Sequence, residues 1–118
     1  MALALLPACD ARAQPADALQ SEVRAVIERG ALPELRRPSF SVHAKGLGRF
    51  YAARGHVPAW FERGHSRPVV ATALAELRSA PEHGLAAEDY DVEWLAQEVR
   101  AIETGAATPA RVARADVA

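Results

Sequence analysis

Apolar residues recur along the chain at the spacing of α-helices rather than strands. In the first such segment, four of them fall at i, i+4, i+7 and i+8: Leu19, Val23, Val26 and Ile27. This spacing places them on one stripe of a helix. Asp17 precedes the stripe as a candidate N-cap, and Gly30 follows it in the position where a left-handed residue commonly ends a helix. The pattern predicts a first helix over Ala18–Arg29.

Two further helices are predicted in the middle of the chain. One covers about Val42–Arg54. Gly46 and Gly48 each destabilise a helix by ~1 kcal/mol relative to alanine, and the alternative is that they allow a neighbouring helix to approach closely. The other follows Ser66, an N-cap candidate, and tolerates Pro68 in its first turn. Its apolar stripe consists of Val70, Ala73, Leu74 and Leu77.

The clearest amphipathic pattern lies in Val92–Glu103, where apolar residues repeat at spacings of 3, 4 and 3. Asp91 precedes this helix as a candidate N-cap. Thr108 and Pro109 predict the start of a fifth helix. We expect the chain to be cut inside this helix, because no terminating residue occurs before Ala118.

The segment of residues 55–61, here called the elbow, interrupts the helical pattern. Gly55 ends the second helix, and Pro58 favours extended backbone at Val57. Residues 62–65 are expected to turn. No segment alternates over strand length apart from a short piece near Pro58. The sequence therefore predicts an all-α fold, a small bundle of four to five short helices with an extended Pro/Trp elbow.

Residues 1–16 are set apart by a short apolar run followed by small residues. The Ala-Arg-Ala triplet at 11–13 is similar to a signal peptidase site, which predicts an exported, periplasmic protein. Because no basic residue precedes this run, we expect the true start to lie upstream. The alternatives are a lipoprotein signal with Cys9 lipidated, which Pro7 fits poorly, and a cytoplasmic chain with an N-terminal tail. Residues 17–118 are the predicted helical domain.

Charge and composition narrow the classes of function. The net charge of −1 lacks the basic excess of a nucleic-acid-binding protein. One cysteine excludes an intrachain disulfide, and no apolar run approaches the ~18 residues of a membrane span. Many of the hydrophobic residues are alanine, so the predicted core is thin.

The histidines and clustered carboxylates of the sequence do not have the arrangement of a catalytic or metal-binding site. No two of the histidines have the spacing of three or four residues that zinc ligands on one helix need: His43, His56, His65 and His83. The clustered carboxylates surround a predicted helix start, where negative charge offsets the helix dipole: Glu88, Asp89, Asp91 and Glu93. We therefore predict no catalytic, cofactor-binding or metal-binding residues, and no cofactor.

The aromatic residues are the one candidate packing or contact surface: Phe50, Tyr51, Trp60, Phe61 and Tyr90. Aromatic side chains bury the most area per residue, so we expect them to fill the core of this alanine-rich bundle. The alternative is an exposed platform that stacks on sugars or contacts a protein.

Two stretches, LGRFYAARGHVPAWF and LRSAPEHGLAAEDYDVEWL, carry a resemblance to a known family. Their order and spacing resemble the N-terminal scaffold region of the large murein L,D-transpeptidases, the YcbB-like group. The matching residues of the first motif are Phe50, Tyr51, Gly55, Pro58 and Trp60. Those of the second are His83, Gly84, Leu85, Asp89 and Tyr90.

This resemblance implies a periplasmic protein that cross-links peptidoglycan stems. Its family has a separate catalytic domain with a cysteine in a Ser-x-Gly-Cys motif and an upstream histidine. Cys9 does not fit that motif, so this chain is expected to be a non-catalytic scaffold segment. Its expected partners are the catalytic domain of the same polypeptide and peptidoglycan. The alternative function is a free-standing periplasmic or lipid-anchored module that binds a partner through the elbow.

Overall fold

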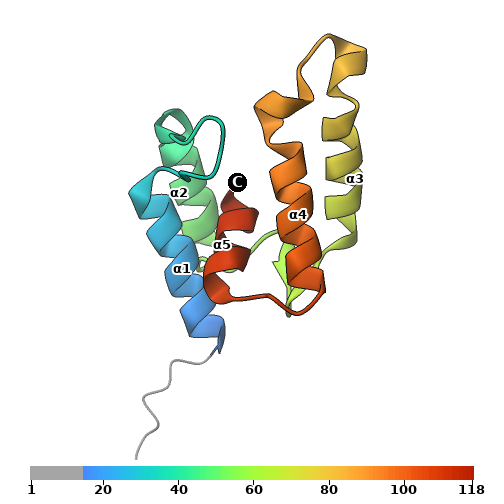
Figure 1. Cartoon of the computed structure of the whole chain (residues 1–118). Coiled ribbons are helices and arrows are strands. Elements are labelled where there is room, and N and C mark those ends of the chain that lie inside the picture. The colour runs from blue at the N-terminus through green and yellow to red at the C-terminus, as the bar shows by residue number, and fades with distance from the viewer. Residues whose placement is uncertain (1–14) are drawn as a thin grey trace, which may run out of the picture.

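The computed structural model of the protein describes residues 15–118, which form mainly helices (Figure 1). The α-helices are α1 (Pro15–Arg29), α2 (Ala44–Ala53), α3 (Pro68–Arg78), α4 (Val92–Glu103) and α5 (Pro109–Val117). Short 3₁₀ helices are η1 (Ser41–His43), η2 (Ala80–His83) and η3 (Ala87–Tyr90). The predicted all-α bundle of four to five helices is confirmed. Residues 1–14 of the predicted leader, with the lipidation alternative at Cys9, lie outside the described residues, whereas its last two residues, 15 and 16, begin α1.

The helices form two antiparallel pairs with α5 between them (Figure 1). α1 packs against α2 on one side, and α3 packs against α4 on the other. α5 contacts both α1 and α4, and its last turn lies between the two pairs. α5 is therefore the element that joins the two halves of the bundle.

The buried apolar residues form two clusters, and α5 contributes to both. The first cluster lies between α1, α2 and α5: Val23, Val26, Leu32, Tyr51, Ala113 and Val117. The second lies between α4, α5 and the elbow: Phe61, Ile102, Val112 and Ala115. Burial on nearly every side of α5 explains why its apolar residues do not keep to one narrow stripe.

A two-residue hairpin follows the elbow, where the sequence predicted only a turn. β1 (Phe61–Glu62) pairs antiparallel with β2 (His65–Ser66). The loop residues Arg63 and Gly64 both have positive φ, 51° and 78°. This is the geometry of a type I′ hairpin turn, whose twist matches that of the paired strands.

Several predicted helix starts need correction. α1 begins at Pro15, so Asp17 lies inside its first turn and does not precede the helix. The second predicted helix is η1 followed by α2. A Cβ added to Gly46 or Gly48 would meet no atom closer than 4.0 Å, so the close approach of a neighbouring helix does not explain these glycines. Arg67, not Ser66, is the N-cap of α3. The predicted Thr108 cap of α5 is confirmed, since its hydroxyl accepts from the Arg111 amide at 3.3 Å.

The segment between α1 and α2 is a closed loop. The Leu32 amide donates to the Pro38 carbonyl at 2.8 Å, and the Phe40 amide donates to the Gly30 carbonyl at 3.1 Å. These bonds close the loop so that the Leu32 side chain packs in the first cluster, where it is fully buried. Phe40 is partly buried against the same cluster, and Leu32 is the more deeply buried residue. Within the described residues, no helix is long and apolar enough to cross a membrane.

Candidate functional site

The elbow leaves α2 in a direction fixed by a helix-ending motif. The Tyr51 carbonyl accepts from the His56 amide at 2.7 Å, and the Ala52 carbonyl accepts from the Gly55 amide at 3.1 Å. This pair of bonds is the Schellman motif, and Gly55 supplies the left-handed residue it needs, with φ of 65°. His56 also has a positive φ of 60°, which is uncommon for a residue with a side chain.

The Arg54 side chain holds the next part of the elbow. Its Nε donates to the Val57 carbonyl at 2.8 Å, and its Nη2 donates to the Pro58 carbonyl at 3.1 Å. The same guanidinium lies over the Phe50 ring, 5.3 Å from the ring centroid, which is a cation–π distance. Hydrogen bonds from one arginine therefore fix the positions of Val57 and Pro58 in the elbow.

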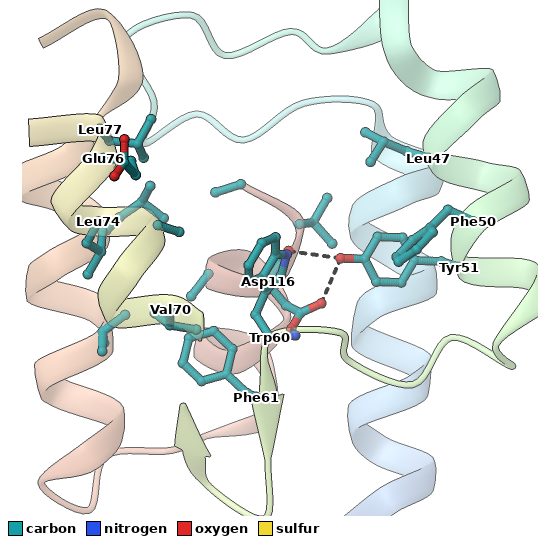
Figure 2. Close-up of a pocket in the computed structure, with 16 residues that line it drawn as sticks. Leu47, Phe50, Tyr51, Trp60, Phe61, Val70, Leu74, Glu76, Leu77 and Asp116 are labelled. Carbon is teal, nitrogen blue, oxygen red and sulfur yellow. Dashed lines mark hydrogen bonds between the residues drawn. The ribbon is translucent and has the colours of Figure 1, made fainter. Parts of the chain in front are cut away.

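Asp116 of α5 fastens the other side of the elbow (Figure 2). Its Oδ1 accepts from the Trp60 amide at 2.7 Å, and its Oδ2 accepts from the Ala59 amide at 2.9 Å. The Tyr51 hydroxyl lies 2.7 Å from Oδ2 and 2.8 Å from the Asp116 carbonyl oxygen, as the dashed lines in Figure 2 show. This carboxylate is 3% exposed, and these donors replace the water it loses on burial.

The Tyr51 hydroxyl is confined to the role of hydrogen-bond donor. Burial raises its pKa above the ordinary value, and the charge of Asp116 and the hydrogen bond to it raise the pKa further, against a smaller lowering by Arg54. The phenol therefore stays neutral at physiological pH. It has one proton to share between the Asp116 carboxylate and carbonyl, so it connects α2 to the last turn of α5 and does not act as a base.

The structure divides the predicted aromatic surface into buried and exposed rings. Tyr51 and Phe61 are buried, as the core interpretation requires. Phe50, Trp60 and Tyr90 are 49%, 40% and 39% exposed, so the expectation that they fill the core is wrong for these three. For Phe50 the reason is its contact with Tyr51. The two rings meet edge to face with centroids 5.0 Å apart, and Tyr51 is the ring that is buried in the core.

An apolar groove of about 660 Å³ opens between the two helix pairs above the last turn of α5 (Figure 2). Leu47 and Phe50 of α2 line one wall, and Ala73, Leu74 and Leu77 of α3 line the other. Val70 of α3, Leu95 and Val99 of α4, Trp60, Phe61 and the end of α5 also line it. Its ionisable side chains are Tyr51 and Asp116, which bond to each other, and Glu76. The groove is thus suited to apolar contact rather than to acid–base chemistry.

A second cavity of about 360 Å³ adjoins the groove, since Leu77, Leu95 and Ala118 line both. The exposed ring of Tyr90 lies on its lining together with Phe40. Leu85 and Tyr90, two residues of the second motif, are both largely exposed, at 51% and 39%.

The carboxylates near the start of α4 connect the two halves instead of capping the helix. Asp91 occupies the N-cap position, but its side chain makes no cap bond and accepts from the Arg36 amide at 2.9 Å. Asp89 forms ion pairs with Arg36 at 3.4 Å and with Arg37 at 3.8 Å. These contacts tie the loop after α1 to η3, across the second cavity.

The Glu103 carboxylate of α4 contacts Ser66 and His65 of the hairpin. One carboxylate oxygen accepts from the Ser66 hydroxyl at 2.6 Å and from the Ser66 amide, and the other lies 3.1 Å from His65 Nδ1. The hydrogen bonds from Ser66, and then that of His65, lower the Glu103 pKa to about 2. Ser66 donates its proton to this weakly basic carboxylate and not to the imidazole, so the cluster lacks a nucleophile–base pair.

Among residues 15–118, no group of three or more His, Cys, Asp or Glu is placed to hold a metal ion. The most consequential polar residue, Asp116, was missed by sequence reasoning. The available signal was an aspartate in a helix whose neighbours are apolar: Val112, Ala113, Ala115 and Val117. Burial of such a residue requires partners, and the elbow amides are these partners.

The helical fold and the elbow fastened by Asp116 define a small, mainly helical domain. In agreement with this class, the sequence matches the Scaffold domain family over residues 45–118, which is more than half of the chain. The chain belongs to this family. No curated protein and no solved structure matches it.

Proposed function

We propose that this chain is a non-catalytic scaffold segment of a periplasmic L,D-transpeptidase, which supports peptidoglycan cross-linking by holding the catalytic domain of the same polypeptide. Membership of the Scaffold domain family supports the scaffold role. The resemblance of the two motifs to the large murein L,D-transpeptidases supports the finer assignment. Peptidoglycan is the second proposed partner.

The observation that carries this proposal is that residues of both motifs make hydrogen bonds or ion pairs that hold the domain together. Gly55 and Pro58 shape the elbow, and the Trp60 amide bonds to Asp116. Asp89 pairs with arginines of the loop after α1. The Trp60 amide and Asp89 thus join one part of the domain to another, while Gly55 and Pro58 shape the chain between α2 and the hairpin, and this use of the motif residues supports a scaffold role.

The test uses the reading frame that continues beyond Ala118, expressed in a host without L,D-transpeptidases. We expect the longer protein to contain a Ser-x-Gly-Cys motif with an upstream histidine and to restore peptide cross-links, measured by muropeptide analysis. Residues 1–118 alone should restore none. Cross-linking by residues 1–118 alone, or a longer frame without these motifs, would contradict the proposal.

Periplasmic location has a separate test. A reporter fused after Ala118 should fractionate with the periplasm, and deletion of residues 1–16 should retain it in the cytoplasm. Cys9→Ser should leave the location unchanged, whereas loss of membrane association in this variant would indicate a lipid anchor.

A second candidate function is favoured by the exposure of Phe50 and Trp60. These rings line the groove and fit a free-standing module that binds a partner through the elbow. Trp60→Ala should then abolish binding to muropeptides or to a partner with little change in melting temperature. Val69→Ala is the matched control, because Val69 is also exposed, at 51%, and does not line the groove.

A further inference from the structure

The segment that contains α2 carries positive charge and no negative charge. No aspartate or glutamate occurs between Glu34 and Glu62, and this stretch holds five basic residues: Arg36, Arg37, Lys45, Arg49 and Arg54. Because the whole chain has a net charge of −1, this segment is a basic region of an otherwise acidic chain. A local excess of one charge creates a potential that attracts partners of the opposite charge.

Two of the five cations have no anionic partner within the domain. The two arginines of the loop after α1 pair with Asp89, and Arg54 donates to carbonyl groups of the elbow. In residues 15–118, no carboxylate forms an ion pair with Lys45 or Arg49. The charges of these two side chains are therefore open to a ligand.

Lys45 and Arg49 lie on one exposed face of α2 and the turn before it, here called the α2 face. Its six residues follow one another at i, i+3, i+4, i+7, i+8 and i+11, which is one side of a helix, and all are exposed: Val42, Lys45, Gly46, Arg49, Phe50 and Ala53. Leu47 and Tyr51, on the other side of α2, pack in the first cluster. The core thus fixes the direction in which the α2 face points.

The α2 face combines its two cations with apolar side chains. Val42 is 89% exposed and Phe50 49%. A Cβ added to Gly46 would meet no atom within 4 Å, so the backbone beside the cations is open as well. A soluble polyanion would need the cations alone. Apolar side chains beside lysine and arginine are instead the composition of protein surfaces that lie at the boundary of a lipid bilayer.

We propose that the α2 face binds the surface of an anionic phospholipid bilayer. Lys45 and Arg49 contact the lipid phosphates, while Val42 and Phe50 enter the layer between the headgroups and the acyl chains. The other side of α2 stays packed in the domain, so the contact is made at the bilayer surface. This binding does not depend on the transpeptidase assignment, because it uses only the charge and the exposure of the α2 face.

The first test measures co-sedimentation of residues 15–118, which hold both buried clusters and leave out the apolar N-terminal run, with lipid vesicles. The vesicles consist of phosphatidylcholine, alone or mixed with an equal part of phosphatidylglycerol. We expect binding to the mixed vesicles, none to pure phosphatidylcholine, and a loss of binding as the salt concentration rises.

Two double variants make this test specific to the α2 face. Lys45→Gln with Arg49→Gln should weaken binding about 30-fold, since each cation near an anionic surface contributes a factor of about 5. Arg29→Gln with Arg100→Gln removes the same charge from exposed positions on α1 and α4. This control should weaken binding by no more than about 2-fold, because charges away from the surface are screened.

A pair of labelled variants separates insertion from charge attraction. Val42→Cys and Val69→Cys each place the single thiol of residues 15–118 at an exposed valine, on the α2 face and on α3. On the mixed vesicles, an environment-sensitive dye should shift its emission to the blue at position 42 and not at position 69. The proposal is overturned by an absence of binding to the mixed vesicles, by equal losses in the two double variants, or by equal dye shifts. Binding to soluble polyphosphate as strong as that to the vesicles, with no shift at position 42, would overturn it in favour of a polyanionic partner.

Discussion

The half of the molecule formed by α1 and α2 is closed around a core, whereas the half formed by α3 and α4 leaves an apolar side open. The first half supplies fully buried residues such as Val23 and Leu32. On α3, Val70 is the buried residue, while Leu74 and Leu77 line the groove and are only partly covered. Similar helical stripes in the sequence thus reach different degrees of burial.

The difference arises from α5, which packs more extensively against α1 than against α4. Polar contacts compensate for the smaller apolar contact in the second half. Asp116 ties the elbow to α5, and Asp89 and Asp91 tie the loop after α1 to the start of α4. In a bundle this small, individual hydrogen-bonded carboxylates therefore determine how the two halves are joined.

The largest expected effect comes from removing the Asp116 carboxylate. Asp116→Ala should lower the free energy of unfolding by ~3–5 kcal/mol, because the partly buried Ala59 and Trp60 amides lose their acceptors at ~1–3 kcal/mol each. Tyr51→Phe removes one hydrogen bond and should cost only ~1 kcal/mol. Urea denaturation measures both. Asp116→Asn, which keeps one acceptor oxygen, provides an intermediate point if the alanine variant unfolds. Equal losses for Asp116→Ala and Tyr51→Phe would show that the elbow amides do not depend on this carboxylate.

A second prediction compares one leucine from each half. Leu32→Ala should destabilise residues 15–118 by ~2–5 kcal/mol, since it empties a fully buried site. Leu74→Ala should cost less than ~1 kcal/mol in the same chain, because its side chain faces the open groove. Thermal and urea unfolding give both values. A Leu74→Ala loss as large as that of Leu32→Ala would mean that the groove is closed in solution.

Much of the fold could be predicted from the sequence because helical periodicity and glycine stops are local signals. The bounds of α4 and the Thr108 cap of α5 follow from them directly. The same kind of local signal located the elbow, because Gly55 and Pro58 interrupt the helical pattern there.

What the sequence could not reveal depends on contacts between distant residues. Leu32 stands between prolines in an apparent linker, and only the hydrogen bonds that close its loop turn it into the core. Asp116 is separated from the elbow by more than fifty residues, and no local pattern relates them. The exposure of Trp60 follows likewise from the position of α5, which covers Phe61 and not its neighbour.

The smallest expected effect is the contribution of Glu103 in the more open half to acid stability. Its pKa of about 2 in the folded protein lies below the ordinary value of 4.5, so the unfolded chain takes up this proton first as pH falls. The stabilisation is therefore complete above about pH 4.5 and is lost between pH 4.5 and about 2. Glu103→Gln should flatten the decline of melting temperature in this window, and solvent screening keeps the change small. Glu93→Gln is the control, because Glu93 is 80% exposed and only approaches Arg78 at 3.7 Å. A decline of the same steepness in Glu103→Gln and the unaltered chain would show that the bonds from Ser66 do not stabilise the hairpin.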